Sequence, residues 1–130
     1  MLAESPIDVM LLAPDLDAAR EFYAECVGLE VLISTDDFLT FACGGDSRLV
    51  ITGSSTGTSE AQTKASWRVR HIGAEVARLR SRGVRVIDYH EPGLTTEDGI
   101  ADVGFALAAW FVDPAGNTLG LLEFKDETLA

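Results

Sequence analysis

The sequence has few cysteines, few basic residues and no long hydrophobic run. Its 130 residues include two cysteines, Cys26 and Cys43, without the spacing of a metal site, which indicates reduced core residues. Lysine and arginine number 10 against 21 aspartates and glutamates, and the net charge is −11. This balance disfavours binding to nucleic acid or to an anionic membrane, and we expect neither as a partner. No segment approaches the roughly 20 apolar residues of a membrane-spanning helix.

The first residues lack a basic segment followed by an apolar run, so we expect no signal peptide and a cytoplasmic location. The hydrophobic content of 47% argues against disorder. A chain of this length is predicted to form one domain, residues 1–130, with a sizeable core.

A repeated segment is the most informative feature that the sequence does contain. Residues 15–31 and 70–86 each predict an amphipathic helix that ends at a glycine, Gly28 or Gly83, and is followed by a strand. A repeat of this kind indicates two copies of one supersecondary module packed together. A ligand site in such proteins usually lies between the copies.

The pattern of strands around each helix predicts an α+β fold of two tandem βαβββ modules. The first module covers about residues 5–53, with strands at Ile7–Ala13, Leu29–Ser34, Phe38–Cys43 and Arg48–Thr52. Asp15 is the predicted N-cap of its helix.

A polar segment, about residues 54–63, is predicted to link the modules. The second module covers about residues 64–125, with strands at Ala65–Val69, Val84–Tyr89, Ala101–Val112 and Thr118–Phe124. Ile72, Val76 and Leu79 mark its helix. Residues 90–100 form a predicted loop with no counterpart in the first module.

Two short motifs in this order resemble the vicinal oxygen chelate superfamily, and more narrowly its glyoxalase/bleomycin-resistance/dioxygenase group. The first is Phe22-Tyr23 followed by Val27-Gly28-Leu29, and the second is the strand and turn from Trp110 to Asn117. The resemblance covers residues 6–124. It implies a curved mixed sheet with a central cleft and helices on the outside, and it commonly implies a homodimer. It does not imply one activity, because this fold supports many.

Metal-dependent members of that superfamily hold a divalent cation inside the curved sheet. Their ligand positions fall on Asp8, Lys64, Gly120 and a residue near Val50 or Ile51 of this chain. Lysine offers no lone pair, glycine has no side chain, and valine and isoleucine are inert. A metal needs three or more converging donors, and Asp8 is one. We therefore expect no metal and no other cofactor.

Three further polar residues are better explained by structural roles. His71 and His90 share no short ligand spacing with each other or with a cysteine. Glu123 lies three residues after Gly120, which places it on the opposite face of the last strand.

Alternation along the strands predicts an apolar trough with a few polar groups. The predicted ligand-binding residues are Asp8, Met10, Leu12, Lys64, Ser66, Arg68, Trp110 and Gly120, with Ala108 and Leu122 beside them. Trp67 is out of phase with this set and is predicted to face the helix. Such a lining is typical of a small-molecule pocket.

Purely structural interpretations of the same residues stay open. Asp8 and Lys64 are also consistent with an ion pair that fills the vacated metal position. Trp110 is also consistent with a plain core residue, and Gly120 either leaves room for a ligand or has no function. The loop at 90–100 either covers the ligand site as a lid or extends into solvent without a function.

Three functions fit the sequence. The first is a metal-free protein that sequesters or senses a small organic ligand, anionic or aromatic in character. The second is a lyase- or isomerase-like enzyme in which Asp8 is the general base and Lys64 or Arg68 stabilises an oxyanion. The third is a structural or regulatory dimer without a ligand.

Overall fold

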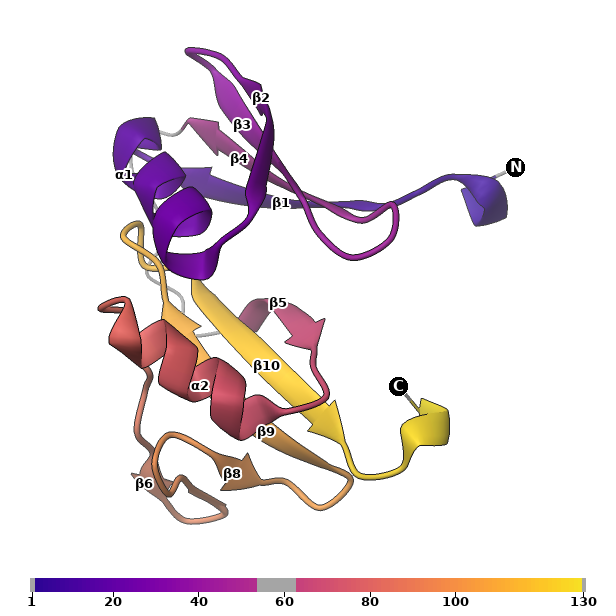
Figure 1. Ribbon diagram of the computed structural model, residues 1–130, viewed down its shortest axis with the longest axis vertical. Coiled ribbons are helices and arrows are strands. Elements are labelled where there is room, and N and C mark those ends of the chain that lie inside the picture. The colour runs from indigo at the N-terminus through magenta and orange to yellow at the C-terminus, as the bar shows by residue number, and fades with distance from the viewer. Residues whose placement is uncertain (1, 54–62, 130) are drawn as a thin grey trace. The chain divides into compact units, whose positions relative to one another are not determined.

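The structure is a computed structural model that describes residues 2–53 and 63–129 (Figure 1). The chain divides into two compact units. The first comprises Met1–Glu60 together with Asp113–Asn117, and the second comprises Ala61–Val112 and Thr118–Ala130. All but the last residue of the predicted 54–63 linker lies outside the described residues.

The first unit has the predicted βαβββ order. Its elements are η1 (Leu2–Glu4), β1 (Asp8–Ala13), α1 (Leu16–Glu21), η2 (Phe22–Val27), β2 (Glu30–Ser34), β3 (Phe38–Ala42) and β4 (Arg48–Gly53). The strands form one sheet in the order β1-β4-β3-β2, in which β1 and β4 are parallel and the other pairs are antiparallel. The predicted strands of this module are confirmed to within a residue or two at their ends.

The helix of the first unit begins as predicted but does not stay α-helical. The Asp15 carboxylate accepts a hydrogen bond from the backbone N–H of Ala18 at 3.0 Å, as an N-cap does. From Phe22 the helix continues as a π-helical turn and ends at Gly28, with φ +88°. The wider turn separates consecutive side chains by a smaller angle. Phe22 and Tyr23 are therefore both buried, with their rings in edge-to-face contact at 5.0 Å.

The core of the first unit lies between this helix and one face of its sheet. Tyr23 and Phe41 are fully buried, and their ring centroids lie 5.6 Å apart. The other buried side chains on this face follow the strand alternation: Leu11, Leu39, Leu49 and Ile51. The period-two pattern of the sequence thus predicts which face of the sheet packs against the helix.

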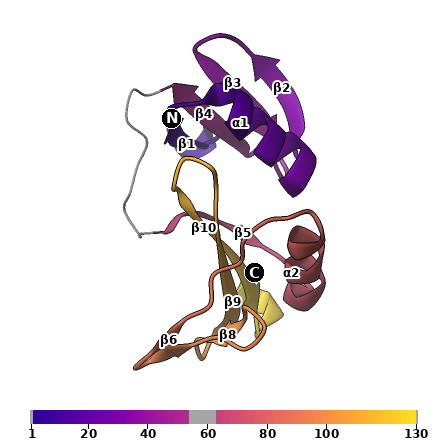
Figure 2. The same cartoon turned by 90° about the vertical axis from the view of Figure 1, so that its left-hand side faces the viewer.

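The second unit has a sheet of the same kind in the order β5-β10-β9-β8 (Figure 2). Its elements are β5 (Thr63–Arg68), α2 (Ile72–Ser81), β6 (His90–Glu91), β7 (Leu94–Thr95), β8 (Ala101–Asp102), β9 (Ala106–Val112), β10 (Thr118–Phe124) and η3 (Glu127–Leu129). Strands β5 and β10 are parallel, and the other pairs are antiparallel. The α+β fold of two βαβββ-type modules is confirmed.

One edge of the second sheet departs from the prediction. The expected strand Val84–Tyr89 is reduced to a bridge between Val86 and Phe111, next to a hydrogen bond from Ile87 N–H to Trp110 C=O at 2.8 Å. The expected strand Ala101–Val112 is divided into β8 and β9 by a turn at Gly104, where φ is +98°. Two short segments therefore share the edge of β9 that one strand was predicted to occupy.

The core of the second unit lies between α2 and the sheet. Ile72, Val76 and Leu79 of the helix are buried, as their spacing predicts. Trp67 stacks on Phe111 with ring centroids 5.9 Å apart. Trp67 is the register partner of Leu121, one of the buried residues of β10. The prediction that Trp67 faces the helix is confirmed.

Candidate functional site

Asp8 forms an ion pair with Arg48, its direct register partner on β4. Arg48 Nε donates to Asp8 Oδ1 at 3.1 Å, and Nη2 donates to Oδ2 at 2.8 Å. This two-pronged contact is the strongest form of a guanidinium–carboxylate pair. The hydrogen bond from Arg48 lowers the pKa of the Asp8 carboxyl below its ordinary value of 3.8, against a smaller opposing effect of desolvation. Asp8 is therefore ionised and already engaged.

The other predicted residues of β1 lie on an exposed face. Met10 is 64% exposed and Leu12 is 47% exposed, whereas Leu11 between them is buried. Across the sheet from Met10 stands Val50, which is 7% exposed. The first unit therefore contributes apolar surface next to a neutralised ion pair.

Register places the predicted residues of the second unit in two rows across the sheet. Ser66, Gly120 and Trp110 are neighbours in one row on β5, β10 and β9. Arg68, Leu122 and Ala108 form the next row. Directly opposed residues point to the same face, so these side chains lie together on the face opposite Trp67.

Lys64 does not follow this simple alternation. The register of β5 against β10 shifts between Thr63, which pairs with Thr118, and Ala65, which pairs with Leu119. Lys64 is the extra residue of this bulge. A bulge re-aims side chains, so the face of Lys64 cannot be read from the strand period. The suggested ion pair between Lys64 and Asp8 stays a prediction.

Gly120 provides less free space than its missing side chain suggests. A Cβ at this position would lie 2.7 Å from Oγ of Ser66 and 3.4 Å from Cγ2 of Thr63. The neighbouring strand thus already fills the room above Gly120. The glycine permits close approach of β5 side chains, and the space it was expected to leave for a ligand is occupied by Ser66.

Trp110 is in contact with another aromatic residue, Tyr89. Their ring centroids lie 5.2 Å apart and the ring planes are nearly perpendicular, at 84°. Trp110 and Tyr89 are both partly exposed. On the sequence alone, Tyr89 ends a predicted strand beside the long loop, and it is not among the predicted ligand-binding residues.

The residues at the family's metal positions do not fit a divalent cation. Asp8 is engaged by Arg48, Gly120 has no side chain, and the Val50 side chain carries no donor atom. Over residues 2–53 and 63–129, no three His, Cys, Asp or Glu side chains gather in a way that could hold a metal ion.

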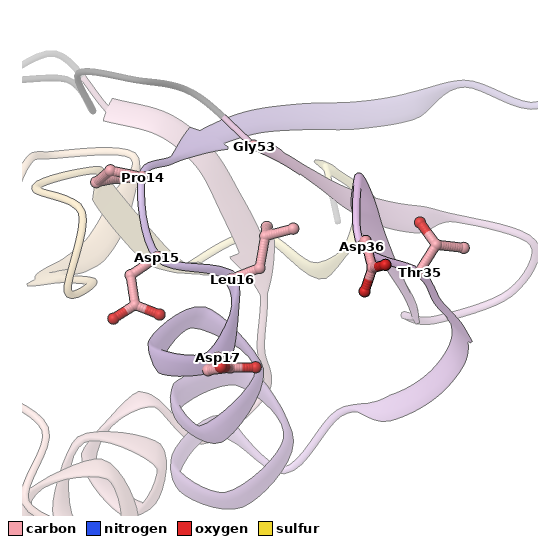
Figure 3. A pocket seen from close by; sticks show the side chains of 7 residues that line it. All are labelled: Pro14, Asp15, Leu16, Asp17, Thr35, Asp36 and Gly53. Carbon is pink, nitrogen blue, oxygen red and sulfur yellow. The ribbon is translucent and has the colours of Figure 1, made fainter.

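A hollow of about 510 Å³ in the first unit is lined by Pro14, Asp15, Leu16, Asp17, Thr35, Asp36 and Gly53. Figure 3 shows two of its aspartates at the start of α1 and a third on the turn that follows β2. Two of its polar residues have local roles, because Asp15 caps α1 and Thr35 Oγ1 accepts from the backbone N–H groups of Asp37 and Phe38. These contacts explain the hollow as a turn and a helix cap.

Glu123 has the structural role that its strand face suggested. Its Oε1 accepts a hydrogen bond from Ile72 N–H at 2.9 Å, at the start of α2. His71 occupies the N-cap position, but its side chain makes no capping hydrogen bond. Glu123, from a strand far along the chain, caps this helix instead.

The Asp113–Asn117 turn is held by a buried polar network within the first unit. The Asp113 carboxylate accepts from Tyr23 Oη at 2.7 Å, from Asn117 Nδ2 at 2.8 Å, and from the backbone N–H groups of Ala115 and Asn117. Asn117 Nδ2 also donates to the C=O of Leu12 at 3.0 Å. These contacts explain why an aspartate begins this turn and an asparagine ends it.

Two βαβββ-type units, with this turn before the last strand, define the class of vicinal oxygen chelate folds. The chain belongs to the Glyoxalase/Bleomycin resistance protein/Dioxygenase superfamily, whose profile matches residues 7–121. No curated protein matches the chain in a sequence comparison.

Solved structures of this family resemble the chain over nearly its whole length. A glyoxalase/bleomycin resistance protein from Streptomyces sp. CB03234 is 26% identical, with a TM-score of 0.67 over 91% of this chain and 99% of that one. TnmS3, an antibiotic binding protein from the same organism, is 25% identical, with a TM-score of 0.65 over 94% and 98%. A glyoxalase family protein from Bacillus anthracis is 22% identical, with a TM-score of 0.72 over 94% and 96%.

Sequence reasoning missed two residues that shape the candidate site, Arg48 and Tyr89. Arg48 is found by register alone, because its partner Asp8 is 40 residues away in sequence. The signal for Tyr89 was an aromatic residue immediately before an unusually long loop.

Proposed function

We propose that this protein binds a small organic ligand without transforming it, either to sequester it or to sense it, and that it does so without a metal ion. The observation that carries this proposal is the Asp8–Arg48 ion pair. A general base must be free to accept a proton near the working pH. Asp8 is the sequence's candidate base, and its lowered pKa and two hydrogen bonds make it a poor one.

The chemistry of the second unit supports a ligand that is aromatic, anionic or both. Trp110 offers an aromatic ring on the face that also carries Ser66 and Arg68. Arg68 is exposed and pairs with no carboxylate in the described part of the chain. The likeness to TnmS3, whose title names it an antibiotic binding protein, gives the same class of function independent support.

The test is to recover the bound molecule and ask whether it changes. Native mass spectrometry of the purified protein identifies a co-purified ligand, and incubation of that compound with fresh protein follows its fate. We expect stoichiometric binding and an unchanged compound. Turnover that Asp8→Asn abolishes would contradict the proposal and favour the lyase- or isomerase-like alternative.

The absence of a metal requirement is tested separately. Elemental analysis of protein purified without chelators should find no transition metal near one equivalent per chain. Near-stoichiometric zinc, nickel, iron or manganese would overturn this part of the proposal, because it would require metal ligands other than the residues at the family's metal positions.

We further propose that the protein is a homodimer in the cytoplasm. Met10 and Leu12 on the edge strand β1 expose apolar surface of the kind that a second copy covers. Cys26 and Cys43 form no disulfide with each other, which supports a reducing compartment. No helix in the described residues is long and apolar enough to cross a membrane. Sedimentation should give about twice the chain mass of 13.9 kDa, and a monomer at micromolar concentration would contradict the dimer.

A further inference from the structure

The segment predicted as a loop at 90–100 contains a short hairpin, β6–β7, that is fastened at its base. The backbone N–H of Tyr89 donates to Thr96 Oγ1 at 2.9 Å, and the N–H of Thr96 donates to Tyr89 C=O at 3.0 Å. Thr96 Oγ1 also donates to Asp88 Oδ1 at 3.4 Å. Thr96 is 4% exposed, so its side chain is shielded from water, whereas Asp88 is exposed. A threonine side chain thus sets the position of Tyr89.

Arg80, on helix α2, holds both ends of the same segment. Its Nη1 donates to the C=O of Asp98 at 3.2 Å, and its Nη2 lies 3.9 Å from Asp88 Oδ1. Gly99 lies against it, since a Cβ there would come within 3.0 Å of Arg80 Nη2. The hairpin is therefore tied to a helix as well as to itself. These contacts favour a segment that stays in place over a lid that opens freely.

The fastened hairpin places Tyr89 against Trp110 at a right angle. A planar ring that lies parallel to one of these two rings is nearly perpendicular to the other, because they meet at 84°. The corner formed by the Tyr89 and Trp110 rings therefore offers a flat aromatic ligand one stacked and one edge-to-face contact at the same time. Both are favoured geometries for aromatic pairs. A puckered, saturated ring of the same size gains neither.

A cation stands on the same face of the sheet. Trp110 and Ser66 share one row, and Arg68 is one row further along β5. Ordinary sheet spacings put the Cα atoms of Trp110 and Arg68 about 12 Å apart, which the long arginine side chain can partly bridge. A ligand seated in the corner can therefore reach Arg68 with an anionic substituent.

We propose that Tyr89 is a specificity-determining residue and that the corner it forms with Trp110 selects planar aromatic ligands that carry an anionic group. Arg80 acts as a positioning residue, through Asp88 and Asp98. This inference rests on the proposed binding function and narrows it to one ligand class.

Three matched probes test the inference by calorimetry on the full chain: 2-naphthoate, its saturated analogue decahydro-2-naphthoate, and the neutral 2-naphthamide. The wild-type protein should bind 2-naphthoate about tenfold more tightly than the saturated analogue, the size expected of aromatic contacts. Arg68→Met should remove the preference for 2-naphthoate over 2-naphthamide. Equal binding of the planar and saturated acids would overturn the inference.

Variants separate Tyr89 from general effects on the fold. Tyr89→Phe keeps the ring and should keep the planar preference, whereas Tyr89→Leu should reduce it to about twofold or less. Arg80→Met should lower the ratio of the two affinities. Arg78→Met is the matched control, because Arg78 pairs with Glu75 on the same helix and does not touch the hairpin. An unchanged ratio in Tyr89→Leu would refute the role of Tyr89.

The two proposals fail in different ways. If another compound co-purifies and binds unchanged while 2-naphthoate does not bind at millimolar concentration, the ligand class is wrong and the binding function stands. If the co-purified compound is converted, the binding function fails, whatever the result with the naphthyl probes.

Discussion

The two units of this protein begin alike and differ at one edge. In the first, β2 runs beside β3 as one continuous strand with a single bulge. In the second, the corresponding edge of β9 is shared between a bridge at Val86 and the short strand β8, with the β6–β7 hairpin between them. The strands beside the helix keep the repeat because they share one core. The outer edge of the sheet is less constrained by core packing, so it tolerates an inserted segment, here the one that carries Tyr89.

The helices of the two units show the same contrast in their caps. Asp15 caps α1 from the adjacent position in sequence, whereas Glu123 caps α2 from 51 residues away. Equal secondary structure thus rests on local side chains in one unit and on tertiary contact in the other. Five experiments challenge or refine this comparison.

The largest effect should come from the buried network of the first unit, which has no counterpart among the hydrogen bonds of the second described here. Asp113→Ala leaves the Tyr23 hydroxyl and two backbone N–H groups without their acceptor. We expect the free energy of unfolding to fall by about 3 kcal/mol or more. Denaturant titration measures it. Asp113→Asn keeps one acceptor oxygen and should lose less; equal losses would show that the network contributes little.

Gly99 tests the rebuilt edge of the second unit. A Cβ there would lie 2.6 Å from Val86 Cγ1, and φ is +80°, a conformation that side chains disfavour. Gly99→Ala should cost about 2–3 kcal/mol, from strain and crowding together. Gly83→Ala, with the same φ and nothing near its Cβ position, should cost about 1 kcal/mol. Similar melting temperatures for the two variants would contradict the crowding argument.

Alkaline pH should weaken the first unit through Tyr23. Burial, and then the charge of Asp113, raises the pKa of Tyr23 well above its ordinary value of 10.0. The unfolded chain therefore releases this proton first, so the stability that Tyr23 contributes is complete below pH 10 and is lost as the pH rises. The slope should approach about 1.4 kcal/mol per pH unit. Tyr23→Phe should lack this slope in stability measured against pH, and Tyr89→Phe, in the second unit, should keep it.

The caps can be exchanged. Asp15→Ala and Glu123→Ala should each cost about 1 kcal/mol. His71→Ala should cost almost nothing, because the His71 side chain makes no capping hydrogen bond. Adding His71→Asp to the Glu123→Ala variant should recover most of the lost stability, because it gives α2 a local N-cap like that of α1. Failure of this rescue would mean that Glu123 stabilises the unit by another route.

The smallest effect concerns the partly exposed Asp8–Arg48 pair. Arg48→Met should raise the pKa of Asp8 toward 3.8, as followed by carboxyl carbon NMR. Because the folded pKa is the lower one, the pair stabilises the protein above the ordinary pKa and this contribution is lost as the pH falls through the folded pKa. The change in stability at neutral pH should be slight, since solvent screens the pair. An unchanged Asp8 pKa in the variant would contradict the role assigned to Arg48.

Local patterns in the sequence were sufficient for most of the fold. Two periods, 3.6 for the helices and 2 for the strands, identified both helices and six of the expected eight strands, and also the face of Trp67. They failed for Val84–Tyr89, which keeps only a bridge at Val86, and for Ala101–Val112, which a turn at Gly104 divides. They failed again at Phe22, where a π-helical turn replaces the α-helix. In each place, packing outweighed a propensity that is weak over a few residues.

The sequence by itself determined the family, the repeated unit and the residues available on each strand face, because these depend on spacing along the chain. Tertiary structure alone decided which of those residues meet. Strand register joined Asp8 to Arg48, a bulge removed Lys64 from the alternation, and a fastened hairpin brought Tyr89 to Trp110. These contacts depend on the pairing of distant segments, and a period along one strand carries no information about its partner.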